Sequence, residues 1–154
     1  MRINGQRAQF RASNVAVTRH TSLTVDTHGK GLYSFTEAVQ AWLSSQQLSS
    51  GLLTIFIQHT SCSLVIQENA DPDVVLDMRD FFETLVPEKH HNYRHKAEGP
   101  DDMTSHIRAA LTSTSLTIPV IDGRLALGTW QGLYVFEHRT RPHRRKVVLQ
   151  FLGD

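Results

Sequence analysis

Three histidines have positions in the sequence that favour metal binding. His59 ends an apolar strand pattern, His106 falls on the apolar stripe of a short helix pattern, and His95 lies in the polar stretch before that helix. Neutral imidazoles from separate elements can hold a divalent ion and leave room for water or a substrate. The sequence therefore predicts an open site for a divalent metal ion, with zinc favoured and magnesium as the alternative. The competing interpretation is that these rings are packed core residues, and His138 is a competing ligand.

Carboxylates gather at the two places where a helix pattern begins after a strand or a loop. They are Glu68 and Asp71 at the first junction, and Glu98, Asp101 and Asp102 at the second. Helix capping accounts for Asp71 and for one of the pair Asp101 and Asp102, since a carboxylate accepts hydrogen bonds from the first free amides of a helix. Glu68 and Glu98 have no such structural role. They are candidates for orienting histidines or for acid–base catalysis.

A glutamate and an arginine complete the apolar face of a late strand pattern. Leu133, Val135, Glu137 and Arg139 alternate along this strand and share one face. Charged groups on a buried face need partners. Glu137 and Arg139 are therefore either a buried structural ion pair, or Arg139 binds an anionic group such as a phosphate through two hydrogen bonds.

Composition narrows the classes of function. A formal net charge of +1 gives no support to a nucleic-acid binder that relies on a basic field. No apolar run approaches the roughly 20 residues that span a bilayer, and residues 1–18 lack the apolar core of a signal peptide. We therefore expect neither a nucleic-acid nor a membrane partner, and a cytoplasmic location. The single cysteine, Cys62, lies in a strand pattern and is expected to be a buried thiol.

The periodicity predicts one domain over residues 1–154, of the α+β class: a mixed, mostly antiparallel β-sheet with about three helices packed on it. A capping box at Ser34-Phe35-Thr36-Glu37, the pair Asp71-Pro72, and Asp101 or Asp102 mark the three helix starts. The expected strands cover residues 6–12, 22–27, 51–59, 61–67, 115–120, 124–127, 132–138 and 146–152, with a turn at Asp122-Gly123.

Several blocks of the sequence, taken in order, resemble the YjbQ-like family from residue 51 to the C-terminus. These blocks are Gln58-His59-Thr60-Ser61, Glu68-Asn69-Ala70-Asp71-Pro72, Tyr93-Arg94-His95, Glu98-Gly99-Pro100-Asp101-Asp102-Met103, Ser105-His106, Gly128-Thr129-Trp130-Gln131-Gly132 and Glu137-His138-Arg139. The chain departs from the common pattern at Thr104, where a proline is frequent, and in the turn at residues 140–143, which is usually rich in glycine. Neither departure removes a candidate group.

The resemblance implies an α+β fold, a homotrimer, and a metal or anion site lined by histidines and acids. Members of the family are often described as secondary thiamine-phosphate synthases. That activity joins a pyrimidine diphosphate to a thiazole phosphate with loss of pyrophosphate, and it is regarded as a side activity. The candidate residues, with their expected roles, are His59, His95 and His106 for the metal, Glu68, Glu98, Asp71 and Asp102 for catalysis, and Arg139, Gln131, Thr60 and Asn69 for the substrate or its phosphate.

Three functions compete at this point. The first is a small metal-assisted enzyme that acts on a phosphorylated or pyrophosphorylated metabolite, because a metal ion and an arginine stabilise the charge that develops on a departing phosphate. The second is a non-catalytic trimeric module that binds a metal or a small anion. The third is purely structural, with the histidines neutral and packed in the core.

Overall fold

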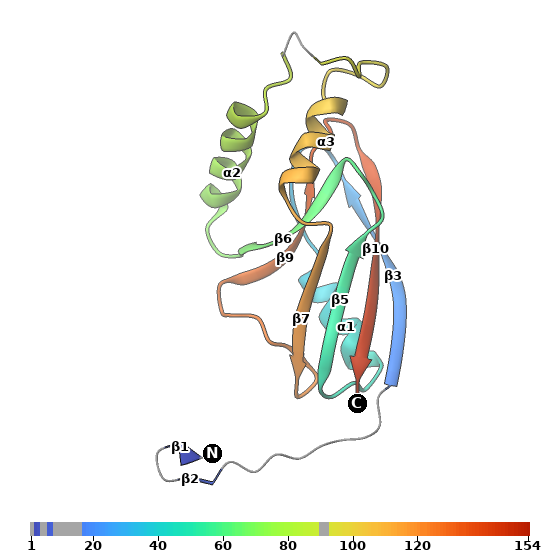
Figure 1. Cartoon of the computed structure of the whole chain (residues 1–154), viewed down its shortest axis with the longest axis vertical. Coiled ribbons are helices and arrows are strands. Elements are labelled where there is room, and N and C mark those ends of the chain that lie inside the picture. The colour runs from blue at the N-terminus through green and yellow to red at the C-terminus, as the bar shows by residue number, and fades with distance from the viewer. Residues whose placement is uncertain (1, 4–5, 8–16, 90–92) are drawn as a thin grey trace.

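Antiparallel sheets and three helices make up the computed structural model, which describes residues 2–3, 6–7, 17–89 and 93–154 (Figure 1). The helices are α1 (Thr36–Ser45), α2 (Pro72–Leu85) and α3 (Asp102–Leu111). The strands are β1 (Arg2–Ile3), β2 (Gln6–Arg7), β3 (Val17–Thr27), β4 (Gly31–Ser34), β5 (Gly51–Ile57), β6 (Cys62–Glu68), β7 (Ser115–Ile121), β8 (Arg124–Leu125), β9 (Gln131–Glu137) and β10 (His143–Gly153). The predicted α+β class is confirmed. Of the first expected strand, only Gln6–Arg7 falls within the described residues.

The largest sheet has the strand order β3-β10-β5-β7-β8. β10 lies between β3 and β5 and is antiparallel to both. Its residues alternate between buried and exposed, so that Val147, Leu149 and Phe151 enter the core. These side chains meet the alternating buried residues of β5, and together they form most of the core under this sheet.

The second sheet has the order β4-β9-β6 and positions most of the candidate residues. β9 is buried at every residue from Gly132 to Glu137. It pairs with β6 so that Cys62 lies opposite Glu137 at one end and Glu68 lies opposite Gln131 at the other. The strands thus form separate sheets rather than one, because β9 pairs only with β4 and β6 among the described strands. The expected buried thiol is confirmed, and burial raises the pKa of Cys62 to about 12.

The helix starts at α1 and α2 differ in how they are capped. Asp71 caps α2 as predicted, accepting a hydrogen bond from the Asp73 amide at 2.9 Å, with Pro72 in the first turn. The predicted capping box of α1 is wrong. Phe35 occupies the cap position without a side-chain hydrogen bond, and the Thr36 hydroxyl accepts from the Leu133 amide at 2.8 Å. A contact with β9, and not a capping box, therefore fixes the start of α1.

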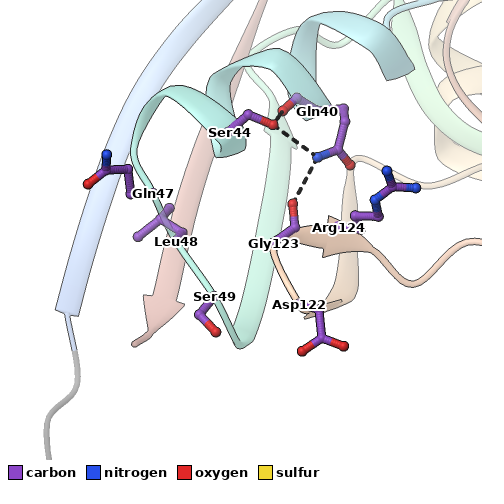
Figure 2. A pocket seen from close by; sticks show the side chains of 8 residues that line it. All are labelled: Gln40, Ser44, Gln47, Leu48, Ser49, Asp122, Gly123 and Arg124. Atoms are coloured by element: carbon purple, nitrogen blue, oxygen red, sulfur yellow. Dashed lines mark hydrogen bonds between the residues drawn. The ribbon is translucent and has the colours of Figure 1, made fainter.

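The turn between β7 and β8 confirms the Asp122-Gly123 prediction. Both residues have positive φ, 51° and 73°, which is the backbone that a two-residue hairpin turn requires. Gln40 of α1 fixes this turn by donating to the Gly123 carbonyl at 2.9 Å (Figure 2). The Gln40 side chain also accepts a hydrogen bond from the Leu125 amide. A cavity of about 620 Å³ lies beside the turn, and none of the predicted site residues lines it.

Candidate metal centre

The structure brings His95, Asp102 and His106 together. One ligand atom from each lies within 4.8 Å of the others. The Asp102 Oδ2 atom is 2.5 Å from His95 Nε2 and 3.6 Å from His106 Nε2. Asp102 and His106 share a face because they are one turn apart in α3, and His95 reaches them from the loop before the helix. His95 and His106, two of the three predicted metal ligands, therefore lie close together. The third member of the cluster is Asp102, which was predicted to be a catalytic group.

A backbone carbonyl sets the orientation of the His106 ring. His106 Nδ1 lies 2.9 Å from the Thr60 carbonyl oxygen, just after β5. A carbonyl oxygen only accepts, so Nδ1 carries the proton, and Nε2 is the ring nitrogen that faces Asp102. Such an outer hydrogen bond is typical of histidines that ligate metals. Thr60, predicted as a substrate ligand, contributes this backbone contact.

Arg139 holds the Asp102 carboxylate from the inner side. Its Nη1 donates to Asp102 Oδ1, its Nε donates to Asp101 Oδ2 at 3.2 Å, and its Nη2 donates to the Glu98 carbonyl at 2.8 Å. The guanidinium is buried, and each of its three nitrogens already donates to a protein oxygen. Arg139 thus positions Asp102 from the buried side of the cluster. The sequence had instead predicted Arg139 as a ligand of the substrate phosphate.

Asp101 completes this support. Burial by itself raises the pKa of Asp101, but hydrogen bonds from the Thr140 amide and hydroxyl, together with Arg139, outweigh burial and lower the pKa. The carboxylate is therefore ionised near neutral pH and holds the Arg139 guanidinium in place. Asp101 is not an N-cap by its side chain, since that side chain binds Thr140 instead of the helix amides.

His59, the third predicted metal ligand, faces β10 instead. Its Nε2 accepts a hydrogen bond from the Lys146 amide at 2.8 Å, and its Nδ1 lies 3.5 Å from Arg145 Nη1. Burial, followed by the Arg145 charge, lowers the pKa of His59, so the ring is neutral near pH 7. Within one chain His59 is therefore a neighbour of the cluster, through Thr60, and not a member of it.

The sequence missed the partner of Glu137. That partner is Arg145: its Nε donates to Glu137 Oε2 at 2.6 Å and its Nη2 to Oε1 at 2.5 Å, and both side chains are buried. A signal was available, because Arg145 alternates with Val147, Leu149 and Phe151 and so lies on the buried face of β10. The expected Glu137–Arg139 pair is replaced by two separate ion pairs.

His138, the competing ligand, is a core residue. Its ring packs 4.5 Å from that of Phe136, and its Nε2 lies 2.9 Å from the Ser63 hydroxyl. Burial, with the nearby Arg108 charge, lowers the pKa of His138 to about 3. The ring is therefore neutral and structural, as the third interpretation expected for the histidines in general.

The remaining candidates lie at the opposite end of β6 and β9. Asn69 donates to the Thr129 and Gln131 carbonyls, and the Gln131 side chain accepts from the Gly128 amide. These contacts shape the loop before β9. Glu68 ends β6, whose length from Cys62 is about 20 Å at about 3.3 Å per residue. Figure 1 shows α3 and its preceding loop at the top, and the tip of β6 below and to the left.

The donor set of the cluster fits zinc. Two imidazoles and one carboxylate leave a fourth position open, as in catalytic zinc sites. Bonds of about 2.0–2.1 Å place tetrahedral ligand atoms roughly 3.3 Å apart, and the Asp102 contacts of 2.5 and 3.6 Å bracket that separation. Asp102 is 2% exposed at its side chain while His95 is 45% exposed, so the cluster has a buried base and an open side.

A cavity of about 570 Å³ opens beside His95. Its other lining residues are Glu88, Lys89, Tyr93, Lys96, Gly99 and Pro100. Cavities of this size hold small metabolites. Lys89 and Lys96 place two positive charges on its wall, and Glu88 on the same wall is paired with Lys30.

Comparison with known proteins places the chain in a family. Residues 21–154 match the family described as UPF0047 protein YjbQ-like. The UPF0047 protein sll1880 of Synechocystis is 52% identical over 132 residues, covering 86% of this chain and 90% of the relative. YjbQ of Escherichia coli O157:H7 is 40% identical over 134 residues, covering 86% and 96%. The chain belongs to the YjbQ-like UPF0047 family, as its sequence motifs indicated.

Solved structures agree with the fold. The conserved hypothetical protein TT1486 from Thermus thermophilus superposes with a TM-score of 0.75 at 35% identity, covering 83% of this chain and 97% of that protein. A YbjQ-like protein of unknown function from Sulfolobus solfataricus gives a TM-score of 0.82 at 19% identity, over 91% and 100%, which supports the fold alone. Among the described residues, no helix has the length and apolar character to cross a bilayer.

Proposed function

We propose that this protein is a small metal-assisted enzyme acting on a phosphorylated or pyrophosphorylated metabolite in the cytoplasm, as a homotrimer. The observation that carries the proposal is the meeting of His95, Asp102 and His106, with His106 oriented by a carbonyl and Asp102 by Arg139. The cavity with Lys89 and Lys96 beside His95 supports an anionic substrate.

The cluster would hold a divalent ion, with zinc favoured over magnesium. When bound, the ion supplies a Lewis acid that stabilises charge on a departing phosphate or pyrophosphate. Lys89 and Lys96 bind the anionic end of the substrate. Arg139 keeps the Asp102 carboxylate aligned, because its guanidinium donates a hydrogen bond to that carboxylate.

Glu98 is the group we assign to proton transfer. Its side chain is 69% exposed and lies 4.0 Å from Arg139 Nη1, while its carbonyl is bonded to the same guanidinium. It therefore stands at the open side of the cluster, attached to the residue that positions Asp102. The reaction proposed at finer detail is a thiamine-phosphate synthase-like transfer, which joins a pyrimidine diphosphate to a thiazole phosphate and releases pyrophosphate.

The second candidate function is a non-catalytic trimeric module that binds a metal or small anion. The burial of Arg139 favours it, since the arginine expected to hold phosphate is committed to protein oxygens. The two functions differ in whether Glu98 is needed for anything beyond binding.

The test combines metal binding with turnover. We expect Glu98→Gln to retain Zn²⁺ binding, measured by calorimetry, and to lose at least about tenfold in pyrophosphate release. His106→Ala should lose both, and Glu37→Gln on the exposed face of α1 should lose neither. Zn²⁺ binding without pyrophosphate release by the wild type would favour the binding module, and absence of both Zn²⁺ and Mg²⁺ binding would overturn the metal-assisted enzyme.

A further inference from the structure

β3 forms the outer edge of the largest sheet, where it pairs with β10 alone among the described strands. It is 11 residues long, its register with β10 runs without a bulge, and it contains neither proline nor lysine. Natural edge strands are usually short or are protected by these devices. At the start of β3, Arg19 donates to the Thr18 carbonyl at 3.0 Å and so occupies part of the edge. The later part of the strand has no such protection.

The register of β10 shows which residues present their backbone at this edge. The Lys146 carbonyl accepts a hydrogen bond from the chain just after β5, so the Lys146 backbone faces β5. Backbone groups alternate in direction along a strand, so those of Val147 face β3 and the opposite residue, Leu23. The amides and carbonyls of Ser22 and Thr24, on either side of Leu23, therefore point outward. No described residue forms a hydrogen bond with them.

A groove of about 510 Å³ follows this edge between β3 and the start of α1. Leu23 and Val25, both half-buried, line it from the strand, and Phe35 and Ala38 line it from the helix side. An open strand edge beside such a groove is suited to an extended peptide, because main-chain hydrogen bonds give affinity and alternate side chains enter the groove. The groove shares no residue with the cavity beside His95.

Glu37 gives the groove a negative charge. It is exposed, and its carboxylate has no ion-pair or hydrogen-bond partner within the described residues. It is also the one charged side chain among the described residues that line the groove. Asp26, further along β3, is paired with Arg144 at 3.4 Å, so its charge is compensated. The groove therefore favours a segment that carries a basic residue among its apolar ones.

We propose that β3 and α1 bind an extended peptide segment of another protein, which adds a strand to the sheet along residues 22–26. Its main chain bonds to the outward amides and carbonyls of Ser22 and Thr24. Apolar side chains at alternate positions enter the groove over Leu23 and Val25, and a lysine or arginine on the same face pairs with Glu37. This surface does not depend on the proposed metal site.

A synthetic peptide tests the surface by NMR titration of the whole chain. The probe is a capped heptapeptide with threonine at the odd positions, valine at positions two and four, and lysine at position six. Its addition should shift the amide signals of Ser22 and Thr24 and slow their hydrogen exchange, because amides that gain a partner are protected. Absence of binding, or binding that leaves these two amides unchanged, would overturn the proposal.

Proline substitutions separate the open edge from the rest of the strand. Thr24→Pro removes an outward amide and keeps the bonds to β10, so it should weaken binding of the probe at least about tenfold. Thr18→Pro, at the same edge but outside the groove, is the matched control and should leave the affinity unchanged. Ala38→Trp fills the groove from an exposed helix position and should weaken binding as well, without any change to the strand. Wild-type affinity in both Thr24→Pro and Ala38→Trp would contradict the proposal.

Charge reversal tests the pairing with Glu37. The wild type should bind the lysine probe about threefold more tightly than the same peptide with glutamate at position six, as expected for an exposed ion pair. Glu37→Lys should reverse that order. An order that stays the same would remove the basic residue from the proposed partner.

A second copy of this chain is the alternative occupant of the edge. Sedimentation equilibrium of the wild type and Thr24→Pro distinguishes the two, since a strand edge that joins copies would lose assembly in the variant. Unchanged assembly together with weakened binding of the probe supports the peptide site. Assembly lost in Thr24→Pro and kept in Thr18→Pro would overturn it.

Discussion

Glu137 and Arg145 form the most deeply buried ion pair next to the candidate centre. Burial by itself raises the pKa of Glu137, but hydrogen bonds from Arg145, the Arg139 amide and Thr27 outweigh it and lower the pKa. The carboxylate is therefore ionised and connects β9 to β3 and β10. The pair also contacts His59, because Arg145 Nη1 lies 3.5 Å from Nδ1 of that ring.

Removal of both members of this pair should cost less unfolding free energy than the two single removals added together. Arg145→Met alone leaves a buried carboxylate without a counter-charge, at about 3–5 kcal/mol of unfolding free energy. Arg145→Met combined with Glu137→Gln should be less destabilising than the sum of the two single changes by at least about 2 kcal/mol. Urea unfolding of the four proteins measures this coupling, and additive effects would show that the pair is not a coupled unit.

His138 makes the stability depend on pH. Its pKa is about 3 in the folded protein, lowered mainly by burial, against 6.5 for an ordinary histidine. Between these values the unfolded chain binds a proton that the folded chain rejects. The contribution of the neutral His138 ring to the unfolding free energy is therefore complete above about pH 6.5. It is lost as the pH falls toward 3, at up to about 1.4 kcal/mol per pH unit.

The measurement is the difference between wild type and His138→Gln across that range. The glutamine keeps a hydrogen-bonding group near Ser63 but cannot titrate, so its unfolding free energy should decline less steeply below pH 6.5. His20→Gln, in the exposed part of β3, is the matched control for removing a histidine. Parallel curves for wild type and His138→Gln would contradict the assignment.

Single residues show what the sequence could and could not predict. Asp102 and His106 are one turn apart on a helix, so their proximity was accessible from spacing. The orientation of His59 was not, because it depends on the Lys146 amide of a strand more than 80 residues away. Arg145 was accessible from alternation, and the spacing of Glu137 and Arg139 was misleading because each has a partner from another element.

At the scale of elements, the start of α2 separates a structural from a catalytic role for Asp71. Its side chain caps the Asp73 amide. Asp71→Ala should lose about 1 kcal/mol of stability, and Asp71→Ser, which keeps a capping oxygen, should lose only a few tenths. Thermal unfolding measures both. Loss of pyrophosphate release in a fully stable Asp71→Ser protein would instead assign the carboxylate to catalysis.

The elements also show where periodicity fails. The apolar side chains of α2 divide between inside and outside, because Phe82 is buried while Phe81 and Leu85 are 59% and 52% exposed. Spacing identifies an apolar helix face but does not say whether the same chain covers it. The local capping signal at Ser34 failed for a related reason, since hydrogen bonds between Leu133 of β9 and the residues Phe35 and Thr36 fix the start of α1 instead.

At the scale of the molecule, sheet register decides how the candidate residues are distributed. The sequence places His59 and Glu68 nine residues apart, within what reads as one site. The extended β6 between them carries Glu68 away from the cluster, and the pairing of β9 carries Gln131 with it. Fold class was predictable from the pattern of strands and helices, whereas the separation of the two groups required the register.

Among the described residues, the whole molecule therefore brings one candidate metal cluster together, made of His95, Asp102 and His106. The central claim is that this cluster binds a divalent ion. The most direct measurement is elemental analysis with Zn²⁺ calorimetry on untagged wild type, His106→Ala and, as a control, His59→Ala. The account predicts near one zinc per chain for wild type and His59→Ala, and none for His106→Ala. Equal metal content in wild type and His106→Ala, or no metal in the wild type after reconstitution, would contradict it.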